Sequence, residues 1–166
     1  MITSTLQEFF QLLQVNRPII SVDYGTRKTG IAISNQEHTI AMPIKTIYEI
    51  TEENKIKSIL DLIATYSSCG VVVGLPISMN GQASDQTAIV LKFSKKLSLA
   101  INLPIYLQDE RLTSLAANSL LKSLGIKRRE RNQKDDSIAA SMILETTLDS
   151  IKKLNSNYLL SKFSKK

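Results

Sequence analysis

Hydrophobic and polar positions along the first fifty residues predict one short helix followed by three strands. Residues 3–15 carry apolar side chains at helical spacing. Two β-rich runs, Ile19–Asp23 and Gly30–Ser34, are separated by a turn-like segment, which is typical of an antiparallel hairpin. Residues 39–48 form a third predicted strand, and Pro43 marks it as an edge strand.

From residue 51 onward, helical patterns alternate with short continuous apolar runs. Such runs are typical of strands whose two faces are both covered. The predicted helices cover residues 51–66, 83–101, 111–125 and 135–151, and the predicted strands cover residues 69–76 and 103–110. The alternation predicts an α/β fold, in which a five-stranded mixed sheet is flanked by helices on both faces.

The chain length of 166 residues suits one domain with a substantial core. We expect a helical extension at residues 1–18 and the main domain at residues 19–150. Residues 151–166 are rich in lysine and are expected to form a loosely docked C-terminal tail.

Composition limits the expected cellular compartment and the kinds of metal site that the protein can form. No apolar run approaches the roughly 20 residues of a membrane span, and no signal sequence is evident. The lone Cys69 excludes an internal disulfide and is consistent with the reducing cytoplasm. With one cysteine and one histidine, His38, a zinc centre is not expected. Any metal would need oxygen ligands, which favours Mg²⁺ or Mn²⁺.

The formal net charge of +6 comes entirely from the C-terminal part of the chain. Residues 1–121 contain ten basic and ten acidic residues, whereas residues 122–166 contain eleven basic and five acidic ones. The densest part is a basic segment with Lys127, Arg128, Arg129, Arg131 and Lys134. Such a run is either a solvated loop or an arm that contacts the phosphates of a nucleic acid, and charge alone does not decide between them.

Three acidic residues occupy positions where a site is expected. Asp23 ends the first predicted strand, Glu110 ends the last one, and Asp136 begins the final helix. Functional sites of such sheets gather at the carboxyl ends of parallel strands. A cluster of carboxylates that holds two divalent cations is the usual arrangement for phosphodiester cleavage.

Each acid also has a structural interpretation. Asp23 could accept backbone N–H groups across the hairpin, and Glu110 could form an ion pair with Arg111 or a lysine. Asp135 or Asp136 could cap the final helix. Taken one at a time, none of these residues indicates a function, and their joint placement is the stronger signal.

Four segments together resemble the YqgF family of bacterial proteins, which are RNase H-like. These segments are IISVDYGTRKTGIAIS, VVVGLPISMNGQ, LQDERLTS and KDDSIAASMIL, and the resemblance covers Ile19 to Asp149. The family is described both as pre-16S rRNA nucleases and as Holliday junction resolvases. The resemblance therefore implies an RNase H-like fold and a metal-dependent nuclease site.

The resemblance also assigns roles to residues. Asp23, Glu110 and Asp136 match the acidic positions of the family and become the expected catalytic residues and ligands of Mg²⁺ or Mn²⁺. Asp135 stands where the family usually has an apolar residue, so either aspartate could point inward, and we favour Asp136. Candidate contacts to the substrate are Arg27, Lys28, Arg111, Lys127, Arg128, Arg129, Arg131 and Lys134.

Loop glycines and Arg111 have more than one interpretation. Gly25 and Gly30 would allow a tight turn and keep bulk away from a phosphate beside Asp23. Arg111 would either orient Glu110 or neutralise the scissile phosphate.

Two other classes of function compete with a nuclease. The D-x-G-T turn also begins the phosphate-binding hairpin of actin-like ATPases, but those need two such domains, and no second D-x-G turn occurs here. A non-catalytic nucleic-acid-binding module is the other alternative, although all three acids are present. Within the nuclease interpretation we favour pre-16S rRNA over a four-way DNA junction, and a monomer or weak homodimer.

Overall fold

A five-stranded mixed sheet forms the centre of the protein. The structure is a computed structural model that describes residues 1–78, 83–111 and 136–163, with side chains as far as residue 156. The strands are β1 (Ile19–Tyr24), β2 (Thr29–Ser34), β3 (Ala41–Ile47), β4 (Gly70–Leu75) and β5 (Ile105–Asp109). They lie in the order β3-β2-β1-β4-β5, with β1, β4 and β5 parallel to one another. The carboxyl ends of these three strands therefore share one edge of the sheet.

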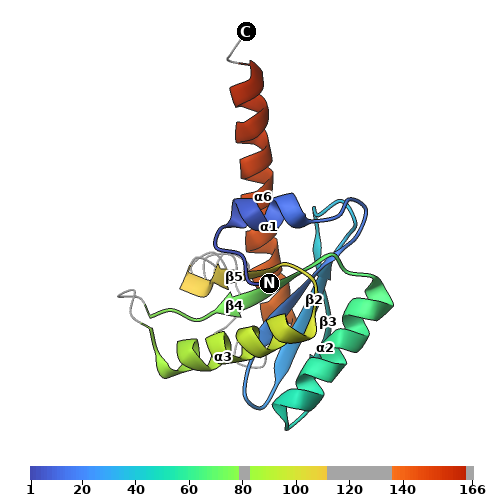
Figure 1. Cartoon of the computed structure of the whole chain (residues 1–166), viewed down its shortest axis with the longest axis vertical. Helices are drawn as coiled ribbons and strands as arrows, with labels where there is room; N and C mark the ends of the chain where they lie inside the picture. Colours follow the sequence, from blue (N-terminus) through green and yellow to red (C-terminus); the bar gives the residue numbers. More distant parts are fainter. Residues whose placement is uncertain (79–82, 112–135, 164–166) are drawn as a thin grey trace, which may run out of the picture.

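Helices cover both faces of this sheet (Figure 1). The described helices are α1 (Leu6–Leu12), α2 (Glu52–Tyr66), α3 (Asp85–Ala100) and α6 (Asp136–Phe163). Side chains alternate along β1, so that Ile20 and Val22 pack toward α2 and α3 while Ile19 packs toward α1 and α6. The expected α/β fold, with helices on both faces of a five-stranded mixed sheet, is confirmed.

Helix α6 is longer than the sequence pattern predicts. The prediction that the final helix ends at residue 151 is wrong, because α6 continues to Phe163. Residues 152–163 contain neither glycine nor proline that would end it. Figure 1 shows this part of the helix extending beyond the sheet. The predicted helix at residues 111–125 lies outside the described residues, and the division of the chain at residues 18 and 150 stays a prediction.

None of the helices in the described ranges is long and apolar enough to cross a membrane.

Two buried polar contacts fasten α6 to the sheet. The Ser21 hydroxyl on β1 donates to the backbone carbonyl of Ala140. On β5, the Gln108 side-chain oxygen accepts a hydrogen bond of 3.0 Å from the Thr147 hydroxyl. These contacts hold the helix at two points along its length, so the position of its first residue, Asp136, over the sheet is fixed.

On the opposite face, a buried lysine holds the turn between β1 and β2. Lys55 of α2 is fully buried, and its ammonium donates to the backbone carbonyls of Gly25 and Thr26, both at 2.7 Å. The same ammonium lies 5.1 Å from the centre of the Tyr24 ring. Burial lowers the pKa of Lys55. The turn that directly follows Asp23 is therefore tied to α2 by charge-assisted hydrogen bonds.

Replacing this ammonium should destabilise the protein. We expect Lys55→Met to lower the free energy of unfolding by roughly 2–4 kcal/mol, because two backbone carbonyls of the turn lose their charged donor. Lys57, which is exposed on the same helix, offers the matched control, and Lys57→Met should change the value by less than about 0.5 kcal/mol. Urea unfolding of the three proteins measures this difference, and equal midpoints for all three would show that Lys55 does not hold the turn.

Candidate active site

Asp23 lies on the face of the sheet that α6 covers, between two glycines. Gly30 of β2 is its direct partner in the antiparallel pair. On the other side, the register of Val22 with Val73 places Gly74 of β4 beside Asp23. Because glycine has no side chain, room is left on both sides of the Asp23 carboxylate.

On the Gly30 side, that room is taken by the start of α6. A Cβ atom at residue 30 would overlap the backbone carbonyl of Asp136, so the helix begins in direct contact with β2. The expectation that Gly30 keeps bulk away from a phosphate missed this contact. Glycine is needed at this position because the first residues of α6 lie against the strand.

On the Gly74 side, that room is taken by Glu110. This residue directly follows the last residue of β5, and a Cβ at residue 74 would overlap its carboxylate oxygen Oε1 and the Cδ1 atom of Ile143. Glu110 thus lies over β4, on the face covered by α6. The structure places all three predicted acids at one edge of the sheet, with Asp23 between Glu110 and Asp136.

Burial and mutual repulsion shift the acidity of these carboxylates. The pKa of Asp23 is raised to about 6, first by burial and then by the charge of Asp136. The pKa of Glu110 is raised to about 7, by burial first and then by the charges of Asp23 and Asp109. Among the described residues, neither carboxylate has a hydrogen bond or an ion pair. Within the described ranges, therefore, Asp23 accepts no hydrogen bond across the hairpin, and Glu110 forms no ion pair with Arg111.

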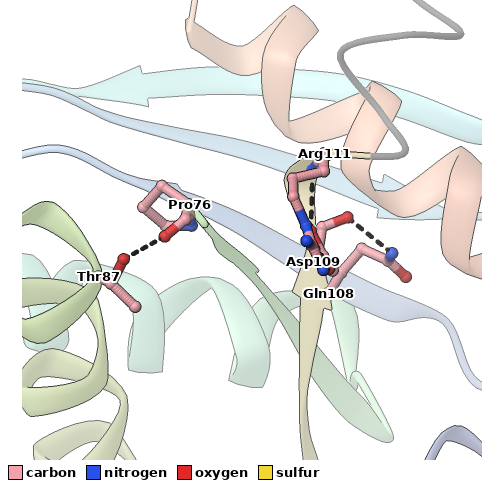
Figure 2. Close-up of polar contacts among 5 residues, drawn as sticks. All are labelled: Pro76, Thr87, Gln108, Asp109 and Arg111. Carbon is pink, nitrogen blue, oxygen red and sulfur yellow. Dashed lines mark hydrogen bonds and ion pairs between the residues drawn. The ribbon is translucent and has the colours of Figure 1, made fainter. Parts of the chain in front are cut away.

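Arg111 pairs with Asp109 and not with Glu110. Figure 2 shows its guanidinium facing the Asp109 carboxylate, with Nη2 2.6 Å from Oδ2 and Nε 3.1 Å from Oδ1. These hydrogen bonds hold the pKa of Asp109 below its usual range. Asp109 is thus occupied at the end of β5, and Glu110 is the acid of the D-E-R motif that remains available at the site.

A second contact fixes the end of the neighbouring strand. The Thr87 hydroxyl in the first turn of α3 donates to the carbonyl of Pro76, which follows β4 (Figure 2). Ser84 and Thr87 also form a capping box at the start of this helix. Pro76, just after the end of β4, is therefore tied to the start of α3.

The other predicted substrate-binding cations, apart from Arg111, divide into two groups. Arg27 and Lys28 are exposed on the turn after β1, and Lys28 Nζ lies 3.9 Å from Asp136 Oδ2. Lys127, Arg128, Arg129, Arg131 and Lys134 lie outside the described residues, as does Asp135. The choice of Asp136 over Asp135 stays a prediction, although Asp136 is the first residue of α6 and contacts β2 through its backbone.

The donor set suits a hard divalent cation. Across the described ranges, no three acidic, histidine or cysteine side chains are close enough as placed to hold one ion. The chemistry nevertheless fits, because Asp23 and Glu110 are half-buried oxygen donors whose charges repel each other and have no described cationic partner. A cation between them would relieve the repulsion that raises both pKa values.

Sequence reasoning missed Lys55 as a residue that supports the site. A signal was present, since Lys55 is one helical turn before the buried Ile59 and so lies on the buried side of α2. A lysine in that position is easily taken for a solvated residue at the edge of the apolar face.

Comparison with solved structures defines the class of fold. RuvC of Thermus thermophilus in complex with a Holliday junction substrate matches with a TM-score of 0.57 at 11% sequence identity, over 84% of this chain and 96% of that one. A second structure of Thermus thermophilus RuvC matches with a TM-score of 0.51 at 12% identity, over 82% and 96%. The fold is therefore that of the RuvC-like, RNase H-like proteins.

Sequence comparison gives the family. The profile of RuvX, described as Holliday junction resolvase, matches residues 17–150, and this chain belongs to that family. A protein of Rickettsia peacockii named "Putative pre-16S rRNA nuclease" is 59% identical over 154 residues, which is 93% of this chain and all of that one. A protein of Rickettsia felis with the same name is 60% identical over the same shares. The resemblance to the YqgF family seen in the sequence is confirmed.

The raised pKa values predict how stability depends on pH in the absence of metal. Between about pH 4 and pH 8 the folded protein holds more protons on Asp23 and Glu110 than the unfolded chain does, so stability falls as pH rises through this range. We expect Asp23→Asn to be nearly neutral at about pH 4 and to stabilise the protein by roughly 1–3 kcal/mol at about pH 8.

Urea unfolding in the presence of a chelator measures this difference at the two pH values. Asp61→Asn, at an exposed position on α2, is the matched control and should follow the parent protein. An Asp23→Asn variant that is no more stable than the parent at the higher pH would contradict the repulsion inferred at the site.

Proposed function

We propose that this protein is a metal-dependent nuclease that hydrolyses phosphodiester bonds and processes the 5′ end of pre-16S rRNA during ribosome biogenesis. The observation that carries the proposal is the position of Asp23 between Glu110 and Asp136, at the edge where β1, β4 and β5 end. Its relatives in Rickettsia carry the name of this activity. We also propose that it acts in the cytoplasm.

Mg²⁺ or Mn²⁺ would be held by Asp23, Glu110 and Asp136. When bound, such ions supply a water nucleophile at neutral pH and neutralise the charge that develops on the phosphate. The protein provides the acids at a fixed position, because α6 and β5 each carry one of them to the glycines that flank Asp23. Arg27 and Lys28, exposed on the adjacent turn, would attract the phosphates next to the cleaved one.

The names of the relatives support pre-16S rRNA as the substrate. Pre-16S rRNA is favoured by proteins that are about 60% identical over 93% of this chain. A four-way DNA junction is the second candidate, supported by the description of the RuvX family and by the RuvC-like fold. A resolvase that cuts two strands symmetrically would be a stable dimer, whereas we propose a monomer or weak homodimer.

The basic segment would add affinity for either nucleic acid. Lys127, Arg128, Arg129, Arg131 and Lys134 precede Asp136 closely in the chain, and we propose that they contact phosphates as a group. A non-catalytic nucleic-acid-binding module would use the same cations but would have no requirement for Asp23 or Glu110.

The deciding experiment is a cleavage assay with Mg²⁺ or Mn²⁺ on two substrates, a pre-16S rRNA that carries its 5′ leader and a four-way DNA junction. We expect cleavage of the RNA. Asp23→Asn, Glu110→Gln and Asp136→Asn should each lower the rate by roughly a hundredfold or more, because each removes a negative ligand. Removal of metal by a chelator should abolish cleavage.

Asp61→Asn is the control for contaminating nucleases and for nonspecific effects of charge, and it should cleave like the parent. Cleavage of the junction alone would transfer the proposal to a resolvase. Binding of both substrates without cleavage of either would replace it with the binding module.

A further inference from the structure

Tyr48 is a large aromatic residue that the fold leaves in solvent beside the candidate active site. It directly follows Ile47, the last residue of β3, and 67% of its surface is exposed. Ile47 pairs with Thr29, which in turn pairs with Tyr24 next to Asp23. Tyr48 therefore lies at the same end of the sheet as the carboxylates, on the β3 side.

Lys28 connects the Tyr48 ring with the carboxylates. Its ammonium lies 5.7 Å from the centre of the ring and 3.9 Å from Asp136 Oδ2. More than half of the Lys28 side chain is exposed, so the ammonium is accessible to a ligand. One cation thus faces both an exposed aromatic ring and one of the acids proposed to act on the phosphate.

The stability of the fold does not explain this arrangement. Exposed ion pairs and exposed cation–π contacts contribute little, because water solvates the charges and the side chains lose freedom. The buried aromatic residue of the same region, Tyr24, instead stacks on Phe93 at a centroid distance of 3.9 Å and donates to Glu52. Among the described residues, Tyr48 stacks on no other ring, and 67% of its surface is exposed.

We propose that Tyr48 and Lys28 form a nucleotide-docking subsite, in which an unpaired base stacks on the Tyr48 ring and its phosphate contacts the Lys28 ammonium. An aromatic ring beside a cation is the usual way in which proteins hold single-stranded nucleic acid, and it tolerates any base because every base has a π face. A paired base has both faces covered by its neighbours. The subsite therefore selects substrates that are single-stranded next to the cleaved bond.

This inference rests on the proposed function, because it assumes that the acids act on a nucleic-acid phosphate. It goes further by naming the form of nucleic acid that the site takes. It also assigns a role to Tyr48, which the sequence pattern identifies only as the last residue of a predicted strand.

The test is binding of an RNA oligonucleotide of about 12 residues with 2-aminopurine at one position, in a chelator so that no cleavage occurs. The parent should quench the 2-aminopurine fluorescence by stacking. Tyr48→Ala should remove the quenching and weaken binding by roughly five- to a hundredfold, whereas Tyr48→Phe, which keeps the ring, should behave like the parent. Lys28→Ala should weaken binding and make it less sensitive to salt.

Tyr66 provides the matched control, since it is a 39% exposed tyrosine at the end of α2, next to the loop that leads into the start of β4. Tyr66→Ala should bind like the parent. A fully paired RNA duplex of the same sequence should bind the parent and Tyr48→Ala equally, and equal urea midpoints of the two proteins would exclude unfolding as the cause.

Unchanged binding and quenching in Tyr48→Ala would overturn the subsite while leaving the nuclease proposal intact, provided that the parent cleaves RNA. A parent protein that neither binds nor cleaves RNA would overturn both. Comparison of Tyr48→Ala with the parent thus tests the subsite, and cleavage of RNA by the parent tests the nuclease proposal.

Discussion

The electrostatic cost of Asp23 is the constraint around which the structure is arranged. A carboxylate in a strand that is covered by a helix is expensive to ionise, and its pKa rises to about 6 through burial and the charge of Asp136. Glu110 adds to the same field and has its own pKa raised to about 7. Two half-buried acids of this kind, with no cationic partner among the described residues, weaken the metal-free fold and favour the binding of a cation.

Backbone geometry makes this arrangement achievable. Gly30 lets α6 start in contact with β2, and Gly74 makes room for the Glu110 carboxylate over β4. Contacts of Ser21 and Gln108 with α6 fix the helix along its length, while Lys55 holds the turn after Asp23 from the other face. The strand end that carries Asp23 is thus held by contacts with α6 on one face of the sheet and with α2 on the other.

Much of the fold and the grouping of the acids could be predicted from the sequence. Buried strands read as continuous apolar runs, and the alternation with helices fixes which strand ends meet, so Asp23 and Glu110 could be placed together before the structure was known. Contacts between residues that are far apart in the sequence, or that compete for the same partner, could not be predicted. The local sequence does not show which neighbour packs against a given residue. Three features depend on this: the pairing of Arg111 with Asp109, the contact of α6 with Gly30, and the burial of Lys55. The length of α6 was missed because its last turns lie beyond the sheet, where polar residues resemble those of a loose tail.

The central claim is that Asp23 and Glu110 share a divalent cation, and calorimetric titration of the protein with Mn²⁺ tests it most directly. At about pH 6.5 these two groups are partly protonated in the free protein, so binding should release protons and the measured heat should depend on the ionisation heat of the buffer. The account predicts that Asp23→Asn and Glu110→Gln each weaken binding and reduce the proton release. Binding of Mn²⁺ with undiminished affinity and proton release in the double variant, or no binding to the parent, would contradict it.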